Sequence, residues 1–125
     1  MPATDFFEDL VLNHALRLEA FTISTWYVGL WLTDPTASGD LDGEITAADY
    51  QRKIISWSGA NQNVSQINWA PATSSWGTIN FLALTNNSTK NTGQVLVYGP
   101  TTEAFTVVSG VPLTILAAGL LLELV

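Results

Sequence analysis

A short acidic stretch, SGDLDGEITAADY at residues 38–50, comes nearest in this sequence to a metal-binding loop. An EF-hand calcium loop places oxygen ligands at its first, third, fifth and twelfth positions and glycine at its sixth. On that frame Asp40 is third, Asp42 fifth, Gly43 sixth and Asp49 twelfth. The spacing therefore raises the question of whether this stretch holds calcium.

The details of the stretch argue against a calcium site. Ser38 stands at the first position, where a hard cation needs a carboxylate, and Asp49 is one carbon shorter than the glutamate that binds in bidentate fashion. Pro35 and Gly39 interrupt any helix before the loop, and YQRKIISW after it favours a strand. We therefore interpret the stretch as an acidic, solvated turn between two strands, and we predict no metal site.

Other arrangements that could do chemistry are weak. The chain has no cysteine and a single histidine, so a zinc site would need carboxylates for nearly all of its ligands. That histidine, His14, lies in an expected helix with leucine at both i±4 positions, which is typical of a packed side chain. No glycine-rich loop opens a helix, and no serine lies in a nucleophile-elbow motif. We predict no catalytic residue, no cofactor and no small-molecule substrate.

Two carbohydrate-directed alternatives are left open. Paired carboxylates hydrolyse a sugar bond when they face each other across a cleft, but the candidates crowd into one turn: Asp40, Asp42, Glu44 and Asp49. Five tryptophans could stack on sugar rings: Trp26, Trp31, Trp57, Trp69 and Trp76. Trp26 and Trp31 share an expected strand at an odd separation, so they point to opposite faces, and packing roles are favoured. A carbohydrate-binding module stays as an alternative, with a glycan hydrolase behind it.

Composition narrows the classes of function further. Eleven acidic residues against four basic ones give a net charge of −7, which repels a nucleic-acid backbone. Only 12% of residues are charged while 47% are apolar. Apolar surface left on so small a domain indicates burial against partner subunits. We therefore expect protein partners and no nucleic acid.

One helix and a series of strands account for the hydrophobic pattern. Residues 5–20 carry an apolar stripe at three- and four-residue spacing, made of Phe7, Leu10, Val11, His14 and Leu18, with Asp5 expected as the N-cap. Short β-branched and aromatic runs follow between Gly, Pro, Asn and Ser turns, at residues 25–33, 50–57, 64–70, 78–85, 93–99, 103–109, 112–116 and 120–125. About eight strands predict a mainly β fold: an antiparallel, jelly-roll-like β-sandwich with one N-terminal α-helix. The length fits one domain, residues 1–125, with the helix at 5–20 and the sandwich at 25–125.

The apolar C-terminus, VPLTILAAGLLLELV, is shorter than the roughly 20 apolar residues of a membrane span. It is also interrupted by Pro112, Gly119 and Glu123, so we expect no membrane association. The closing strand 120–125 is mostly apolar on both faces, with Leu122 and Leu124 on one of them. We expect this strand to be buried, either in the sandwich or at a subunit contact.

Several segments in order resemble a family of small tailed-phage virion proteins. They are TWYVGLWLTDPT, GEITAADYQRKIISW, NWAPATSSWGTINFLALTNN, GQVLVYG and VVSGVPLTILAAGLLLELV. Tyr50 and Arg52 match a Y-x-R pair of that family, and a central segment is matched by Pro71, Trp76, Gly77 and Ile79. The resemblance covers nearly the whole chain, although its last strand is unusually rich in leucine.

The resemblance implies a non-enzymatic structural protein of the phage particle. Members of the family are often labelled tail-fibre proteins and are similar to capsid cement or decoration proteins that form trimeric knobs. The implied role is a homotrimeric cement protein that binds the major capsid protein on the outer head surface. The implied alternative is a tail-fibre or tail-tip component. The residues we expect at interfaces are Phe7, Leu10, Tyr50, Arg52, Leu122 and Leu124, and Arg52 is expected to contact several carboxylates or carbonyls.

Overall fold

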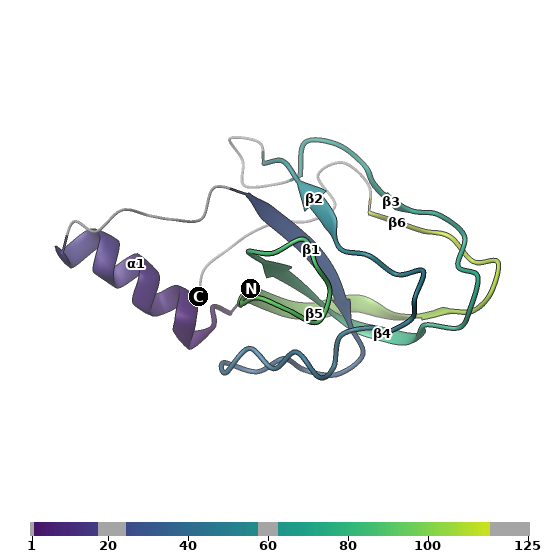
Figure 1. The fold of residues 1–125 in the computed structure, drawn as a ribbon, viewed down its shortest axis with the longest axis horizontal. Coiled ribbons are helices and arrows are strands. Elements are labelled where there is room, and N and C mark those ends of the chain that lie inside the picture. Colours follow the sequence, from purple (N-terminus) through teal and green to yellow (C-terminus); the bar gives the residue numbers. More distant parts are fainter. Residues whose placement is uncertain (1, 18–24, 58–62, 116–125) are drawn as a thin grey trace.

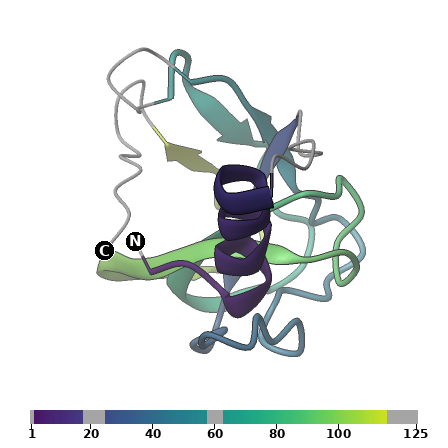
Figure 2. The same cartoon turned by 90° about the vertical axis from the view of Figure 1, so that its left-hand side faces the viewer.

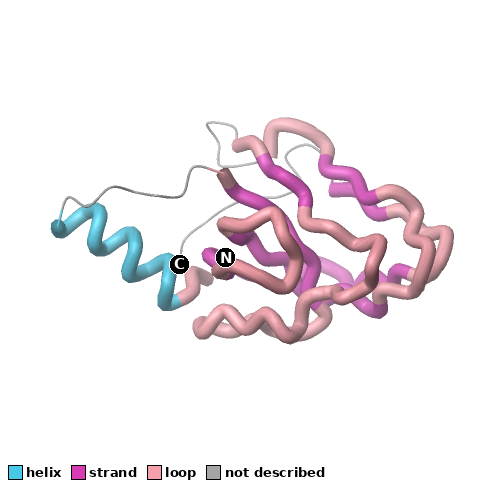
Figure 3. The backbone as a smooth tube through the Cα atoms, in the orientation of Figure 1, coloured by secondary structure: helices cyan, strands magenta, loops and turns pink. Residues whose placement is uncertain are grey.

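The computed structural model describes residues 2–17, 25–57 and 63–115 (Figure 1). In this part of the chain one helix precedes six strands: α1 (Asp5–Arg17), β1 (Trp26–Trp31), β2 (Lys53–Ile55), β3 (Ile67–Trp69), β4 (Gly77–Thr85), β5 (Val95–Val107) and β6 (Leu113–Ile115). Long loops connect the short strands (Figure 3). The fold is mainly β with one helix, as the sequence predicted.

The strands form two antiparallel sheets. The larger sheet has the order β2-β1-β4-β5, and β3 pairs with β6 in a two-stranded sheet. β1 lies inside the larger sheet because it pairs with β2 along one edge and with β4 along the other. In Figure 1 the β3-β6 pair lies on the side of the molecule away from α1.

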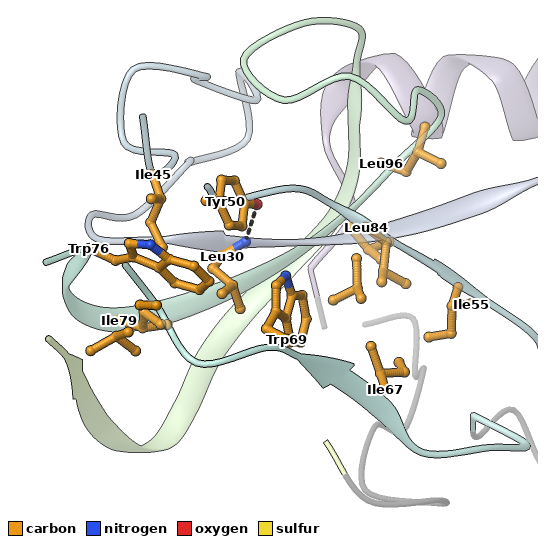
Figure 4. Close-up of a cluster of buried hydrophobic side chains, with 14 of the residues drawn as sticks. Leu30, Ile45, Tyr50, Ile55, Ile67, Trp69, Trp76, Ile79, Leu84 and Leu96 are labelled. Atoms are coloured by element: carbon orange, nitrogen blue, oxygen red, sulfur yellow. Dashed lines mark hydrogen bonds between the residues drawn. The ribbon is translucent and has the colours of Figure 1, made fainter. Parts of the chain in front are cut away.

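The main core lies between the larger sheet and β3 (Figure 4). Residues alternate along β4, so Ile79 is buried while Thr78 and Asn80 are exposed. Ile67 and Trp69 of β3 face the same core, and the residue between them is exposed. Each fully buried aliphatic side chain of this kind stabilises the fold by about 1.5–3 kcal/mol.

A second, smaller cluster lies on the opposite face of β1. Trp31 packs there with Ala83 and Val95, whereas Trp26 packs against the main core. The predicted opposite orientation of these two tryptophans is therefore confirmed. β1 is buried on both faces from Val28 onwards, which explains its nearly continuous apolar sequence.

Thr4, rather than the expected Asp5, caps α1. Its hydroxyl accepts a hydrogen bond from the N–H of Phe7 at 3.4 Å and donates to the carbonyl oxygen of Val95 at 2.5 Å. The N–H of Thr4 also donates to the carbonyl oxygen of Leu96 at 2.8 Å. The buried threonine thus fixes the start of the helix to β5.

α1 contacts the rest of the protein through its first turns. Phe7 is buried and meets the ring of Trp26 edge-on, with centroids 5.4 Å apart, and Val11 is half-buried against the core. Further along, His14 is exposed and Leu16 is 77% exposed. Figures 1 and 2 show the helix standing beside the sheet, with its far end pointing away from it.

The expected sandwich of about eight strands is met only in part. The expected strands at 93–99 and 103–109 are one continuous strand, β5, whose register against β4 shifts between Ile79 and Phe81. A break was expected at Pro100. However, the N–H of Tyr98 donates to the carbonyl oxygen of Pro2 and therefore points away from β4. The backbone nitrogen of Pro100, two residues further on, points to the same side. A proline on that outer edge removes no bond from the sheet.

Other boundaries differ less. The helix expected at 5–20 is confirmed over Asp5–Arg17, and positions 18–20 lie outside the described residues. The expected strand at 120–125, with Leu122 and Leu124, also lies outside them. In the described part of the chain, six strands in sheets of four and two replace the expected eight-stranded arrangement.

Candidate functional site

A buried ion pair lies where the sequence predicted a solvated acidic turn. Arg52 Nη2 is 2.7 Å from Glu44 Oε1, and both side chains are 0% exposed. Arg52 Nε also donates to Glu44 Oε2 at 2.8 Å, so the contact is bidentate. Glu44 forms an isolated β-bridge with Trp31, which holds it against the sheet. The solvated interpretation is therefore wrong for Glu44.

Tyr50 extends this polar cluster towards β1. Its hydroxyl accepts a hydrogen bond from the N–H of Leu30 at 2.9 Å (Figure 4). The same hydroxyl donates to Glu44 Oε2 at 2.8 Å. Burial, together with the neighbouring Glu44 carboxylate, raises the pKa of the Tyr50 phenol well above its usual range. The phenol therefore keeps its proton and remains a donor.

Gly29 makes room for the cluster. A Cβ atom at this position would lie 2.9 Å from Glu44 Oε2 and 3.0 Å from the Tyr50 hydroxyl. No ordinary side chain fits without displacing one of these groups. Glycine at this point of a central strand thus has a packing reason.

The arginine also holds the connection between β4 and β5. Arg52 Nη1 donates to the carbonyl oxygens of Asn87 and Thr92, each at 2.8 Å, and to Thr85 Oγ1 at 3.2 Å. The N–H of Asn91 donates to Glu44 Oε1 at 2.6 Å. The predicted multi-donor contact of Arg52 with carboxylate and carbonyl groups is therefore confirmed.

The Glu44 carboxylate is fully hydrogen-bonded. A carboxylate offers about four lone-pair sites. Glu44 accepts four hydrogen bonds, from Tyr50, from Asn91 and twice from Arg52. The guanidinium donates to Glu44 through Nε and Nη2, and it lies 5.8 Å from the centre of the Trp31 ring. A buried, extensively hydrogen-bonded ion pair of this kind holds the loops around it in place.

Asp49 has a separate structural role. Its carboxylate accepts hydrogen bonds from the N–H of Thr73 at 2.7 Å, from Ser74 Oγ at 3.0 Å and from Trp76 Nε1 at 3.0 Å. The Thr73 and Trp76 bonds, which favour the ionised form, lower the pKa of Asp49 well below its usual range. Trp76 in turn meets the ring of Tyr50 edge-on at 5.5 Å. The turn before β4 is thus attached to the polar cluster.

The acidic residues therefore divide their roles instead of converging on an ion. Asp40 and Asp42 are exposed, and Asp40 Oδ1 accepts a hydrogen bond from the N–H of Asp42. Among the described residues, no group of three His, Cys, Asp or Glu side chains is arranged to hold a metal. Nor does any helix in this part of the chain reach the length and apolarity that crossing a membrane requires.

Hollows with polar linings lie on the surface of the described part of the chain. A hollow of about 380 Å³ is bordered by Tyr50, Arg52 and Lys90, and Lys90 Nζ donates a hydrogen bond to the carbonyl of Ala47. Another, of about 210 Å³, lies between β2 and β3. All five tryptophans are buried or half-buried. An open stacking platform for a sugar ring is therefore not provided by tryptophan.

The structure distributes the expected interface residues over three environments. Tyr50, Arg52 and Phe7 are buried within the chain, and Leu10 is half-buried. Leu122 and Leu124 lie outside the described residues. Any effect of Tyr50 or Arg52 on a partner would act through the loops they hold. The interface role of this set stays a prediction.

Exposed apolar side chains appear at positions that the sequence interpretation did not select. The helix exposes Phe6, Leu12 and Leu16, at 40%, 52% and 77% of their surface. Ile54 on β2 is 62% exposed. The signal for the helical pair was present, because Leu12 and Leu16 are four residues apart and therefore share a face.

The family described as Podophage GP4 fiber I protein gp80 matches residues 2–123 of the chain. No curated protein matches the chain. Because the family match covers nearly the whole sequence, the chain belongs to this family of phage fibre-type structural proteins. The resemblance to small tailed-phage virion proteins is thereby confirmed.

Proposed function

We propose that the chain is a non-enzymatic structural subunit of a phage fibre attached to the tail. The observation that carries this proposal is the match to the fibre I family over residues 2–123. A fibre subunit works by holding a fixed shape and by binding its neighbours in the particle. Its partners are then other copies of the chain and the virion proteins at the fibre base.

The polar cluster supports the role of a subunit that holds a fixed shape. Glu44, Tyr50 and Arg52 connect the loop before β2 with β1 and with the loop between β4 and β5. The bonds among Glu44, Tyr50 and Arg52, and the bond from Leu30 to Tyr50, are buried, and the bond from Arg52 to Asn87 is partly buried. Networks of satisfied buried polar groups specify a single arrangement of the loops around them. A subunit with such a cluster presents its surfaces to neighbours in one fixed geometry.

A homotrimeric capsid cement protein is the second candidate. It is favoured by the order of the sequence motifs that resemble small virion proteins, including Tyr50, Arg52 and Trp76. In that role the chain would bind the major capsid protein on the outer head surface and bridge neighbouring capsomers. Multivalent attachment through three subunits would strengthen each individual contact.

Immunogold electron microscopy of intact phage particles distinguishes the two candidates. Antibodies raised against the purified chain are expected to label the tail region only. Label scattered over the head would reject the fibre proposal in favour of the cement protein. Particles without any label, from a preparation in which the antibody detects the denatured chain, would also count against the fibre proposal.

A further inference from the structure

The loop between β4 and β5 borders the larger of the surface hollows, which has a volume of about 380 Å³. Ser88, Thr89 and Lys90 line it from this loop, and its other lining residues lie at 48 and 50–52, in the segment that leads into β2. Ligand sites usually have volumes of about 300–1,000 Å³. The hollow is therefore large enough for a small molecule or for one unit of a polymer.

The charge of this lining is opposite to that of the whole chain. The chain has eleven acidic residues and four basic ones, but the lining includes Arg52 and Lys90 and no acidic residue. Glu44 neutralises Arg52 through their buried ion pair, so Lys90 supplies the net positive charge. Within the described ranges no carboxylate forms an ion pair with Lys90. A half-buried ammonium group without a counter-charge favours an anionic ligand.

The ammonium group of Lys90 is held in place while part of its donor capacity stays free. Nζ donates a hydrogen bond to the carbonyl oxygen of Ala47 and lies 5.9 Å from the centre of the Tyr50 ring. An ammonium group has three N–H donors, so two of them remain for a ligand. A carboxylate is the group that such a donor pair binds best, because both its charge and its lone pairs are complementary.

The neutral side chains of the lining suit a ligand rich in hydroxyl groups. Gln51, Ser88 and Thr89 are exposed, and their side chains make no hydrogen bond within the part of the chain that the structure describes. Amide and hydroxyl side chains each supply both donors and acceptors. Hydroxyl groups of a sugar need both, since each of them donates one hydrogen bond and accepts others.

The buried ion pair fixes the loop that borders the hollow. Arg52 Nη1 donates to the carbonyl oxygens of Asn87 and Thr92, which flank the three lining residues of the loop. Glu44 Oε1 accepts a hydrogen bond from the N–H of Asn91, directly after Lys90. A site whose walls are already fixed loses less conformational freedom when a ligand binds. The hollow is therefore preorganised by the polar cluster.

We propose that this hollow binds a sugar acid, with the carboxylate of the ligand at Lys90 and its hydroxyl groups at the neighbouring amide and hydroxyl side chains. The net charge of −7 acts against a densely charged polyanion and favours a ligand unit with a single negative charge. The inference goes beyond the proposed function, because a structural subunit needs no ligand in order to hold its shape.

Titration of the purified, isotopically labelled chain with D-galacturonate, followed by amide NMR shifts, tests the proposal. Saturable shifts are expected at residues 88–90 and at Gln51, with a Kd in the millimolar range because the hollow is open and polar. D-Galactose lacks the carboxylate, and acetate lacks the hydroxyl groups. Each of them, and inorganic phosphate, should bind about tenfold more weakly or less.

Substitutions separate the charge from the hydroxyl contacts. Lys90→Gln keeps a polar side chain without the charge, so it should weaken galacturonate binding about tenfold and leave galactose binding unchanged. Lys53→Gln, at the other half-buried lysine, is the matched control and should change neither affinity. Thr89→Val removes a hydroxyl at nearly constant shape and should weaken the binding of both sugars. None of these side chains belongs to the buried ion pair, and the NMR spectrum of each variant reports whether it folds.

Several outcomes would overturn the proposal. These are the absence of a saturable shift with galacturonate, an affinity for galactose, acetate or phosphate equal to that for galacturonate, and full galacturonate binding in Lys90→Gln. Shifts that saturate at residues away from the hollow would place the ligand elsewhere and would also overturn it. The titrations use the purified chain, so a negative result leaves the fibre proposal standing.

Discussion

Replacing Arg52 with alanine is expected to destabilise the protein strongly. The change removes both hydrogen bonds to Glu44 and the bonds to the carbonyl oxygens of Asn87 and Thr92. Glu44 stays buried, with 0% of its side chain exposed, and keeps only the bonds from Tyr50 and Asn91. The variant therefore contains a buried carboxylate without a counter-charge.

The size of the effect follows from that uncompensated charge. Removing one member of a buried ion pair costs about 3–5 kcal/mol in free energy of unfolding. The free energy of unfolding of a small domain is about 5–15 kcal/mol in total, so the substitution removes a large fraction of the stability. Lys53→Ala, at a half-buried basic residue in the adjoining β2, is the control and should change stability by about 0.5 kcal/mol or less.

Urea denaturation followed by tryptophan fluorescence measures the effect, and a double-mutant cycle tests its cause. The Glu44→Ala, Arg52→Ala double variant also removes the charge. It should be less destabilised than the sum of the two single variants, by about 0.5–3 kcal/mol. A cost below about 1 kcal/mol for Arg52→Ala, or strictly additive single effects, would refute the reasoning.

Three further predictions concern the surroundings of the cluster. Trp76→Ala should cost about 3–5 kcal/mol in urea denaturation because a buried indole is lost, and a cost near zero would contradict its structural role. Asp49→Asn should lower the melting temperature at neutral pH. Because the folded-state pKa of Asp49 is lowered, its stabilisation is present above about pH 4 and is lost as the pH falls below it, so the two melting temperatures should converge in acid. A difference in melting temperature between Asp49→Asn and the unmodified protein that grows in acid would contradict this prediction. Gly29→Ala would place a Cβ atom 2.7 Å from Cζ3 of Trp31, so we expect a cost of about 1–3 kcal/mol, and an unchanged melting temperature would show that the strand has room.

Local patterns predicted the elements that depend on local chemistry. The three- and four-residue spacing of apolar side chains located α1, and alternation located β4. Odd separation correctly placed Trp26 and Trp31 on opposite faces of β1. In each case the physical cause lies within one element, where the side-chain period is fixed by the backbone.

Features that depend on contacts between distant segments were not predicted. Thr4 became the helix cap because its hydroxyl meets β5, ninety-one positions away at Val95. Glu44 is buried because the fold brings it to Arg52 and to Asn91, and its surrounding sequence reads as polar. Pro100 continues a strand because it faces an outer edge. Strand register and sheet order decide the helix cap, the burial of Glu44 and the path of β5. Local sequence propensity predicts neither register nor sheet order.

The central claim, that this chain is a subunit of a tail fibre, is tested most directly by cryo-electron microscopy of the intact phage. The account predicts density for the β2-β1-β4-β5 sheet, with α1 standing beside it, in an appendage attached to the tail. The same density found on the capsid surface, with the tail fibres built from other chains, would contradict it.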